Sequence, residues 1–398
     1  MIDLLYFKKE AENSSNLVKE IRNWLHQYPE LSFNEKNTAT FIVKKLDEWN
    51  IPYQNNIGGN GIIAWIKGSN EDKNIAIRAD MDALPIQEAN DVEYKSKNDG
   101  IMHACGHDVH MACLLGALFI LNKIKSHLKG TIYAIFQPAE EKLPGGAIKM
   151  LNSPFFENKK FDAVIAQHVY PDLPAGYIGI KPGPYMASTD EIYITIKGKG
   201  GHAATPNSIT DTVYIASNLI VNLQSIVSRK ANPIIPTVLS FGKVIANGAT
   251  NIIPDEVKIE GTFRTFDEEW RYKALSYIKE TIENLVNTSG ANAEINIING
   301  YPVLINDIAL TEKVSSLAKR FLQEDKVVIL QQRTTAEDFA YFSHKYPSLM
   351  YRLGTGGIDY CSYPLHSSKF DVNPNIFSFC HGLMAYIAYE LTKTYSTR

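Results

Sequence analysis

The hydrophobic pattern alternates short apolar runs with longer segments of helical periodicity. Apolar residues recur at helical spacing in 17–27 and 35–49, and Pro29 interrupts the path between them. Residues 111–121 are apolar almost throughout and predict a buried helix. Short apolar runs bounded by turn residues predict strands at 61–66, 74–77, 130–136 and 161–166. This alternation predicts an α/β domain whose mostly parallel sheet has helices on both faces.

The pattern changes between residues 187 and 298. Ile192, Ile194 and Ile196 alternate with polar residues, as in a half-exposed strand. Further strands and helices are expected at 211–229, 237–245, 256–266, 268–286 and 293–298. Their order is βαββαβ, which predicts a ferredoxin-like α/β domain inserted into the first one.

The first pattern returns after the inserted segment. Helices are expected at 308–322, 336–343 and 376–391, and a strand at 348–353. The main domain is therefore predicted to be discontinuous, with residues 1–186 and 299–398, and the inserted domain to span 187–298.

Composition narrows the class of protein. The chain has 398 residues, 45% hydrophobic and 21% charged, which is ordinary for a folded globular protein of two domains. A net charge of -3 indicates neither a nucleic-acid nor a membrane partner. The first residues lack the basic and apolar regions of a signal peptide, and four cysteines are too few for a disulfide framework. We therefore expect a cytoplasmic protein.

Cys105, Gly106 and His107 form the first candidate site. A thiol and an imidazole one residue apart, just before the apolar helix, suit Zn²⁺ or a similar divalent ion. The helix N-terminus is expected to lower the pKa of the thiol. On spacing alone, a structural turn with a buried cysteine is an equally good interpretation.

Further polar groups follow three of the predicted strands. They are found in 78–85, in Gln137-Pro138-Ala139-Glu140-Glu141 and in Gln167-His168-Val169. In a parallel sheet these carboxyl ends share one edge, where ligands bind. His366 arrives from the last part of the chain, beside Pro364. Each of these residues can also be a surface or core group, but Cys105, His107, Glu141, His168 and His366 together supply enough donors for two divalent ions if one bridges.

These stretches together resemble the M20 metallopeptidase family, in its aminoacylase, hippurate hydrolase and auxin-conjugate hydrolase branch. Matching segments run in family order over nearly the whole chain, and the combination is specific although no single motif is. The matching segments are 25–32, 78–85, 102–108, 137–141, 167–169, 197–203, 251–254, 261–264 and 364–366.

The resemblance implies a dinuclear metal centre in the main domain, with the inserted domain as lid and dimerisation surface. It implies that Cys105, His107, Glu141, His168 and His366 bind the metals and that Glu140 is the general base. It also implies that His202 stabilises the oxyanion, that Asn251 contacts substrate, and that Arg264 binds the substrate carboxylate. For Arg264, an ordinary surface arginine is the alternative.

The implied activity is hydrolysis of N-acyl amino acids to a free amino acid and a carboxylic acid, by a metal-activated water. Rival activities are a carboxypeptidase or dipeptidase acting on short peptides, and an N-acetyl-diaminopimelate deacetylase. A non-catalytic amino-acid-binding protein and a thiol enzyme with Cys105 as nucleophile are more remote. The donor set favours Zn²⁺ or Mn²⁺ but also suits Co²⁺ or Ni²⁺, and a homodimer or higher homo-oligomer is expected.

Overall fold

The computed structural model describes residues 2–69 and 73–393, which divide into two compact units. The first comprises Met1–Gly183, Ile305–Gln331 and Asp338–Arg398, and the second Pro184–Leu304 and Gln332–Glu337. The sequence places the inserted domain at 187–298, whereas the structure assigns 184–304 to it and adds 332–337. Each unit is described by itself below.

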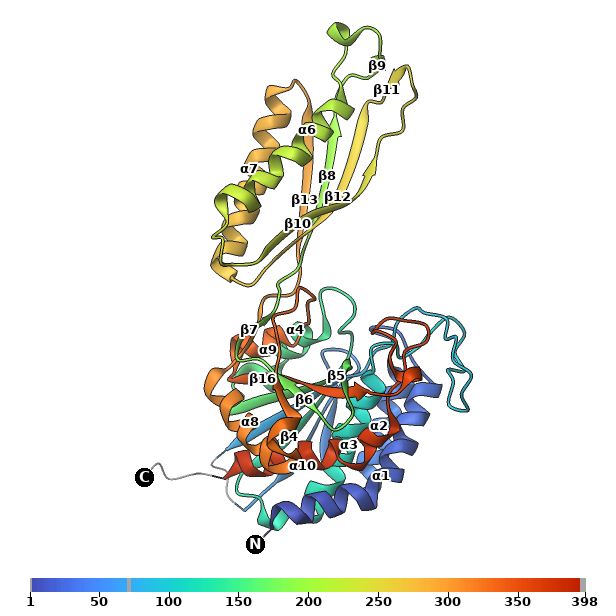
Figure 1. Cartoon of the computed structure of the whole chain (residues 1–398), viewed down its shortest axis with the longest axis vertical. Coiled ribbons are helices and arrows are strands. Elements are labelled where there is room, and N and C mark those ends of the chain that lie inside the picture. The colour runs from blue at the N-terminus through green and yellow to red at the C-terminus, as the bar shows by residue number, and fades with distance from the viewer. Residues whose placement is uncertain (1, 70–72, 394–398) are drawn as a thin grey trace. The chain divides into compact units, whose positions relative to one another are not determined.

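The first unit is an α/β domain (Figure 1). Its strands are β1 (Tyr53–Ile57), β2 (Gly61–Lys67), β3 (Asn74–Asp80), β4 (Thr131–Gln137), β5 (Ala163–Pro174), β6 (Ile178–Ile180), β15 (Val327–Ile329) and β16 (Ser348–Gly356). Its α-helices are α1 (Leu4–Gln27), α2 (Lys36–Glu48), α3 (His107–Lys123), α4 (Gly146–Leu151), α5 (Pro154–Glu157), α8 (Ile308–Leu322), α9 (Ala340–Lys345) and α10 (Cys380–Thr392). Short 3₁₀ turns lie at Lys125–His127, Glu324–Lys326, Asp359–Cys361 and Pro374–Ser378.

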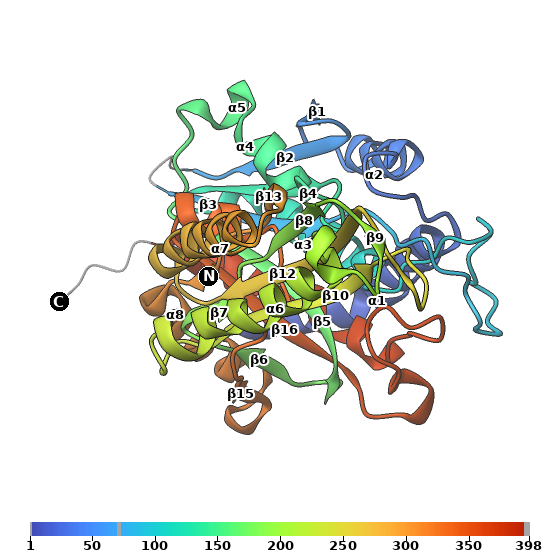
Figure 2. The same ribbon diagram turned by 90° about the horizontal axis from the view of Figure 1, so that it is seen from above.

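Within the described residues, eight strands form one mostly parallel sheet in the order β1-β2-β4-β3-β5-β16-β6-β15. The central neighbours β4, β3, β5 and β16 all pair in parallel, whereas β1, β2 and β4 pair in antiparallel fashion. Strands β1 and β2 lie at one end of the sheet and β6 and β15 at the other (Figure 2). The predicted sheet is confirmed.

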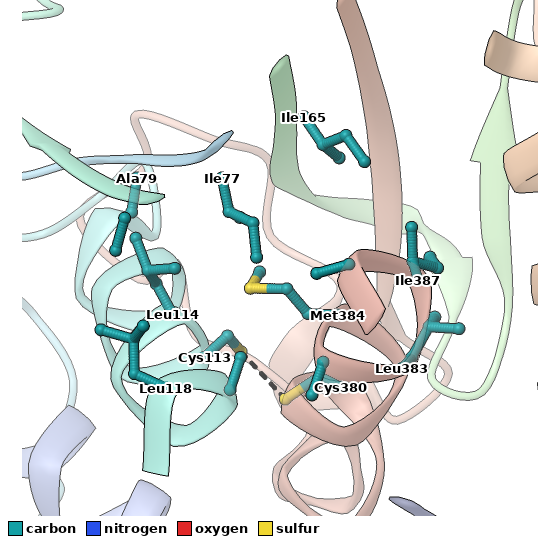
Figure 3. Packing of buried hydrophobic residues seen from close by; sticks show 14 of the residues in the cluster. Ile77, Ala79, Cys113, Leu114, Leu118, Ile165, Cys380, Leu383, Met384 and Ile387 are labelled. Carbon is teal, nitrogen blue, oxygen red and sulfur yellow. Dashed lines mark hydrogen bonds between the residues drawn. The ribbon is translucent and has the colours of Figure 1, made fainter. Parts of the chain in front are cut away.

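Helix α3 is the centre of one face of this sheet. It is apolar on nearly every side, and it packs between α1, α10 and the sheet. Figure 3 shows its Cys113, Leu114 and Leu118 beside Met384 of α10 and Ile77 of β3. Burial of each large apolar side chain contributes about 1.5–3 kcal/mol, so α3 is fixed firmly against the sheet.

The opposite face of β3 carries a polar network. Side chains alternate along a strand, so Arg78 points away from the layer that Ile77 contacts. The buried Arg78 guanidinium donates to Asp80 at 2.6 Å, to Gln137 at 2.9 Å and to Asp338 at 2.9 Å. Asp338 precedes α9, so this network attaches α9 to the face of the sheet opposite α3.

The second unit is the ferredoxin-like domain that the sequence predicts. Within 184–304, all of them described, β10, β12, β8 and β13 form an antiparallel sheet in that order. Figure 1 shows α6 and α7 on one face of it, where their apolar residues form a common core with the strands. The elements are β8 (Asp190–Lys197), β9 (Gly201–His202), α6 (Thr212–Ser225), a π-helical turn (Ile226–Lys230), β10 (Thr237–Ile245), β11 (Ile252–Ile253), β12 (Glu256–Thr265), α7 (Glu268–Thr288) and β13 (Asn292–Asn299). A further 3₁₀ turn lies at Pro206–Ser208, and the short strands β7 (Gly183–Met186) and β14 (Leu304–Asn306) pair where the chain passes between the units.

Several predicted elements differ from the structure, and the helix predicted at 211–229 divides into α6 and a π-helical turn. The first helix begins at Leu4 rather than near 17, because Asp3 caps it by accepting the Tyr6 N–H at 3.0 Å. The helix predicted at 336–343 begins only at Ala340, since Asp338 is held by Arg78. The segment 376–391 divides into a 3₁₀ turn and α10, and β5 continues past His168 to Pro174.

The buried His381 of α10 predicts acid sensitivity of the fold. Burial lowers the pKa of His381 to about 3, and its Nε2 lies 2.8 Å from Ser14 Oγ. Ser14 Oγ donates to Glu10 O, so the neutral His381 donates Nε2–H to Ser14. The unfolded chain protonates this histidine below about pH 6.5, so the free energy of unfolding is expected to fall by about 1.4 kcal/mol per pH unit from about pH 6 toward pH 3.

The measurement compares wild type with His381→Gln, which keeps an N–H donor for Ser14. Urea unfolding at pH 6.5, 5.5 and 4.5 should show a steeper loss of stability in wild type. If the free energy of unfolding falls equally with pH in wild type and His381→Gln, His381 is protonated in the folded protein.

Candidate functional site

The order of the sheet brings three predicted site segments to one edge. Strand β3 pairs in parallel with both β4 and β5, and Asp80 lies opposite Gln137 at the carboxyl ends of β3 and β4. Glu140 and Glu141 follow β4 directly, and His168 lies in β5. The edge is thus the place where ligands of such sheets bind.

Gly106 shapes the turn that presents Cys105 and His107. It is the N-cap of α3 with a left-handed backbone, φ 79°, and a Cβ there would approach Val169 Cγ2 to 2.4 Å. A side chain at this position would meet both a conformational and a steric penalty. Cys105 therefore ends the loop and His107 begins the helix, both buried.

The His366 segment is attached to the same turn by two sets of interactions. The His366 N–H donates to Ala104 O at 2.8 Å. The buried Arg22 of α1 donates to Asp108 at 2.9 Å and to Asp371 at 2.9 Å, so one guanidinium joins the start of α3 to the chain beyond His366. Segments more than 250 residues apart in sequence meet for this reason.

The five predicted donors converge. Cys105 Sγ lies 3.6 Å from His168 Nε2, and Glu141 Oε1 lies 3.3 Å from His366 Nε2 and 3.9 Å from His107 Nε2. Donor atoms lie within 4.8 Å of one another in each of three groups: Cys105, His107 and His168; Cys105, Glu141 and His366; and His107, Glu140 and Glu141. Cys105, His107 and Glu141 each belong to two of these groups.

Hydrogen bonds fix which nitrogen of two histidines faces this space. His107 Nδ1 donates to Asp82 O at 2.8 Å, and His168 Nδ1 donates to Val169 O at 2.8 Å. In the neutral rings Nε2 is then an unprotonated acceptor directed at the other donors. Both rings have the tautomer that metal ligation through Nε2 requires.

A neighbouring cluster has a different character. His107, Asp80 and His110 also lie close enough to hold an ion. However, His110 Nδ1 donates to Asp80 at 2.6 Å and His110 Nε2 accepts the Val169 N–H at 2.9 Å. Since both nitrogens of His110 are engaged, this residue supports its neighbours and has no lone pair left for a cation.

The charge balance of the site corrects one expectation. Burial, followed by Glu141, Glu140 and Asp80, raises the pKa of the Cys105 thiol well above its usual value, whereas the helix N-terminus was expected to lower it. Burial opposes the charged form of His107, but Asp80 and Asp82 outweigh it and raise its pKa to about 10, so a cation that binds Nε2 would displace a proton from this ring. Desolvation and the nearby carboxylates thus set the direction of the shift at Cys105.

The residues fit a divalent cation on structural grounds. His107 Nε2 and Glu141 Oε1 are buried atoms with no hydrogen-bond partner. Buried polar atoms are normally paired, so these two atoms indicate an absent partner of positive charge. Thiolate, imidazole and carboxylate donors suit Zn²⁺, and the carboxylates also suit Mn²⁺.

The other predicted site residues lie in the second unit. His202 in β9 and Asn251 beside β11 meet in one two-stranded ribbon, where Ala203 N–H donates to Asn251 O at 3.0 Å. His202 is exposed, and its Nδ1 accepts the Ala204 N–H at 3.1 Å, so its Nε2 is a free donor. Arg264 lies on β12, half-buried, and donates to Thr334 O at 3.0 Å.

Three residues that support the site were not predicted from the sequence. Asp82 accepts the N–H groups of Glu140 and Glu141, each at 3.0 Å, and Arg22 joins Asp108 to Asp371. Asp80 binds Arg78 and His110. The only sequence signal was the placement of Asp80 and Asp82 just at or after a strand end, whereas Arg22 resembles any charged residue of a surface helix.

Comparison with known proteins agrees with this geometry. The profile of peptidase family M20/M25/M40 matches residues 76–389. An N-acetyl-L-cysteine deacetylase of Bacillus subtilis is 42% identical over 89% of this chain and 85% of its own length, and thermostable carboxypeptidase 2 of Saccharolobus solfataricus is 35% identical over 94% and 98%. The crystal structure of the YXEP protein of Bacillus subtilis, a dinuclear metal binding peptidase from the M20 family, has a TM-score of 0.83 and 35% identity, covering 96% of this chain and 99% of that one.

Proposed function

Because the chain belongs to peptidase family M20/M25/M40 and is a hydrolase of amide bonds, we propose that it cleaves N-acyl amino acids to a free amino acid and a carboxylic acid. The observation that supports this most is that the donor atoms of five predicted ligands lie close together. Two of these atoms, His107 Nε2 and Glu141 Oε1, have no hydrogen-bond partner. The N-acetyl-L-cysteine deacetylase, at 42% identity, gives the substrate class.

We assign metal binding to Cys105, His107, Glu141, His168 and His366. Bound divalent cations would supply Lewis-acid chemistry, polarising the scissile carbonyl and lowering the pKa of water. Asp82 orients His107 through its carbonyl oxygen, and the Val169 carbonyl orients His168. Such supporting hydrogen bonds keep ligand rings aimed and make them more basic.

Glu140 is assigned as the general base. Its carboxylate lies within 4.8 Å of the donor atoms of His107 and Glu141, at the edge of the proposed metal site. The side chain is buried, with the residue 6% exposed, where a carboxylate can take a proton from water and return it to the departing amine.

The residues of the inserted unit are assigned to the substrate. His202 presents Nε2–H, the donor that a developing oxyanion needs. Asn251 lies beside it in the same ribbon, and Arg264 is a fixed guanidinium that suits a carboxylate. These three roles follow from the family resemblance.

A thiol enzyme is less well supported. A cysteine nucleophile needs a lowered pKa, and burial together with Glu141 and Glu140 raises the pKa of Cys105 instead. This reading would also leave Glu141, His168 and His366 without a role.

One assay separates the proposed substrate from its rivals. Purified protein with added Mn²⁺ or Zn²⁺ is incubated with N-acetyl amino acids, hippurate, N-acetyl-diaminopimelate and dipeptides, and the released amines are measured. We expect the highest kcat/KM on an N-acyl amino acid and loss of turnover with a chelator. Preference for dipeptides would instead support the carboxypeptidase activity, for which the 35% identical carboxypeptidase is the precedent.

A further inference from the structure

Ala139, which immediately precedes Glu140, has an unusual backbone conformation. Its φ is 51°, a left-handed value that a residue with a Cβ rarely adopts. Such a conformation costs on the order of 1–3 kcal/mol and persists only where the surroundings impose it. The direction in which the chain enters Glu140 therefore depends on whatever holds Ala139.

Two buried carboxylates hold this segment by three consecutive N–H groups. Glu35 Oε1 accepts the Ala139 N–H at 2.8 Å, Asp82 Oδ1 accepts the Glu140 N–H at 3.0 Å, and Asp82 Oδ2 accepts the Glu141 N–H at 3.0 Å. We call Glu35 and Asp82 the carboxylate cradle. Hydrogen bonds to an ionised acceptor are about twice as strong as neutral ones, so the segment has little freedom.

Glu35 is itself fixed. The residue is fully buried just before α2, and its carboxylate also accepts the Phe33 N–H at 2.8 Å and the Asn60 amide at 2.9 Å. Phe33 is likewise left-handed, with φ 69°. One carboxylate thus joins two strained backbone positions that are more than 100 residues apart in sequence.

The two members of the cradle act on different neighbours. Asp82 reaches both glutamates and also approaches His107 Nδ1 at 3.4 Å, so it lies within the metal site. Of the three consecutive N–H groups, Glu35 accepts only that of Ala139. Removal of the Glu35 carboxylate should free Ala139 while Asp82 keeps Glu141 in place.

We propose that Glu35 is a positioning residue for Glu140, holding Ala139 in the left-handed conformation that aims the Glu140 carboxylate at the attacking water. This proposal rests on the proposed function, because it takes Glu140 as the base. A misplacement of about 1 Å can cost about 10²-fold in rate, so loss of this hydrogen bond should lower kcat more than KM.

Three variants test the proposal. Glu35→Ala removes the Oε1 that accepts the Phe33 and Ala139 N–H groups. Glu35→Gln keeps an oxygen for the Ala139 and Phe33 N–H groups and loses only the acceptor of the Asn60 amide, which still donates to Phe33 O. Glu30→Ala is the matched control, because Glu30 binds the N–H groups of Asn37 and Thr38 at the start of the same helix without contacting Ala139.

We expect kcat to fall roughly 10- to 100-fold in Glu35→Ala, with KM and metal content per chain unchanged. Glu35→Gln and Glu30→Ala should stay close to wild type in kcat. Unchanged kcat in Glu35→Ala, or equal losses in Glu35→Ala and Glu30→Ala, would overturn the proposal while leaving the function intact. Loss of bound metal in Glu35→Ala would also overturn it.

A second measurement does not depend on activity. Hydrogen exchange of a peptide covering 137–145 should be faster in Glu35→Ala than in wild type or Glu30→Ala. Absence of turnover in wild type would refute the proposed function, and the exchange experiment would then decide on the cradle alone. Equal exchange in all proteins would refute the cradle.

Discussion

Replacement of Glu140 by glutamine is expected to remove nearly all hydrolysis while leaving bound metal unchanged. General-base catalysis typically contributes about 10²–10⁴-fold, and the glutamine amide cannot accept the proton. The Glu140 N–H remains bound to Asp82 in the variant, so the backbone should keep its course. The measurements are kcat on an N-acetyl amino acid and metal content per chain after dialysis.

The adjacent Glu141→Gln is the matched comparison. Glu141 Oε1 lies 3.3 Å from His366 Nε2 and has no hydrogen-bond partner, so its replacement should weaken metal binding. If Glu140→Gln loses metal and Glu141→Gln retains it, the two roles are exchanged. Near-normal turnover in Glu140→Gln would refute the assignment of the base.

Much of the fold follows from periodicity. The apolar runs at 74–77 and 130–136 identify β3 and β4, and the βαββαβ order identifies the inserted unit. Parallel pairing places polar residues after β3 and β4 at one edge, so the meeting of the segments 78–85 and 137–141 could be inferred from the sequence.

The supports of the site could not be inferred in the same way. Glu35 lies in an irregular segment and Arg22 on a charged helix, and the site residues that they hold, Ala139 and Asp108, are more than 80 residues away along the chain. Such carboxylates and guanidinium groups have no periodic signal, since their role is set only by which loops the folded sheet brings together. The raised pKa of Cys105 has the same origin, because it depends on the spatial neighbours Glu140 and Glu141.

The length and packing of the helices bear on a possible membrane-spanning segment. Among the described residues, no helix combines the length and apolar character that crossing a bilayer requires. The apolar helix α3 spans 17 residues and packs against α1, α10 and the sheet; Figure 3 shows its contacts with α10 and β3. Its Cys113 lies 2.9 Å from Cys380 of α10, and none of the four cysteines forms a disulfide.

Replacement of Cys105 by alanine is expected to weaken metal binding strongly. Cys105 belongs both to the group with His107 and His168 and to the group with Glu141 and His366, so its loss weakens both. Loss of a supporting residue alone typically costs 10–100-fold in metal affinity, so loss of this ligand should cost at least about 100-fold. The measurement is chelator competition with Zn²⁺ and Mn²⁺, together with metal content per chain.

Cys113→Ala is the matched control, because Cys113 is an equally buried cysteine of α3 outside these groups. Cys113→Ala should bind metal as wild type does, and His168→Ala, which belongs to one group only, should retain more metal than Cys105→Ala. A thiol nucleophile predicts a different pattern, in which Cys105→Ala loses turnover but keeps its metal. Since both readings expect an inactive protein, metal content rather than activity decides between them, and undiminished metal in Cys105→Ala would refute the site.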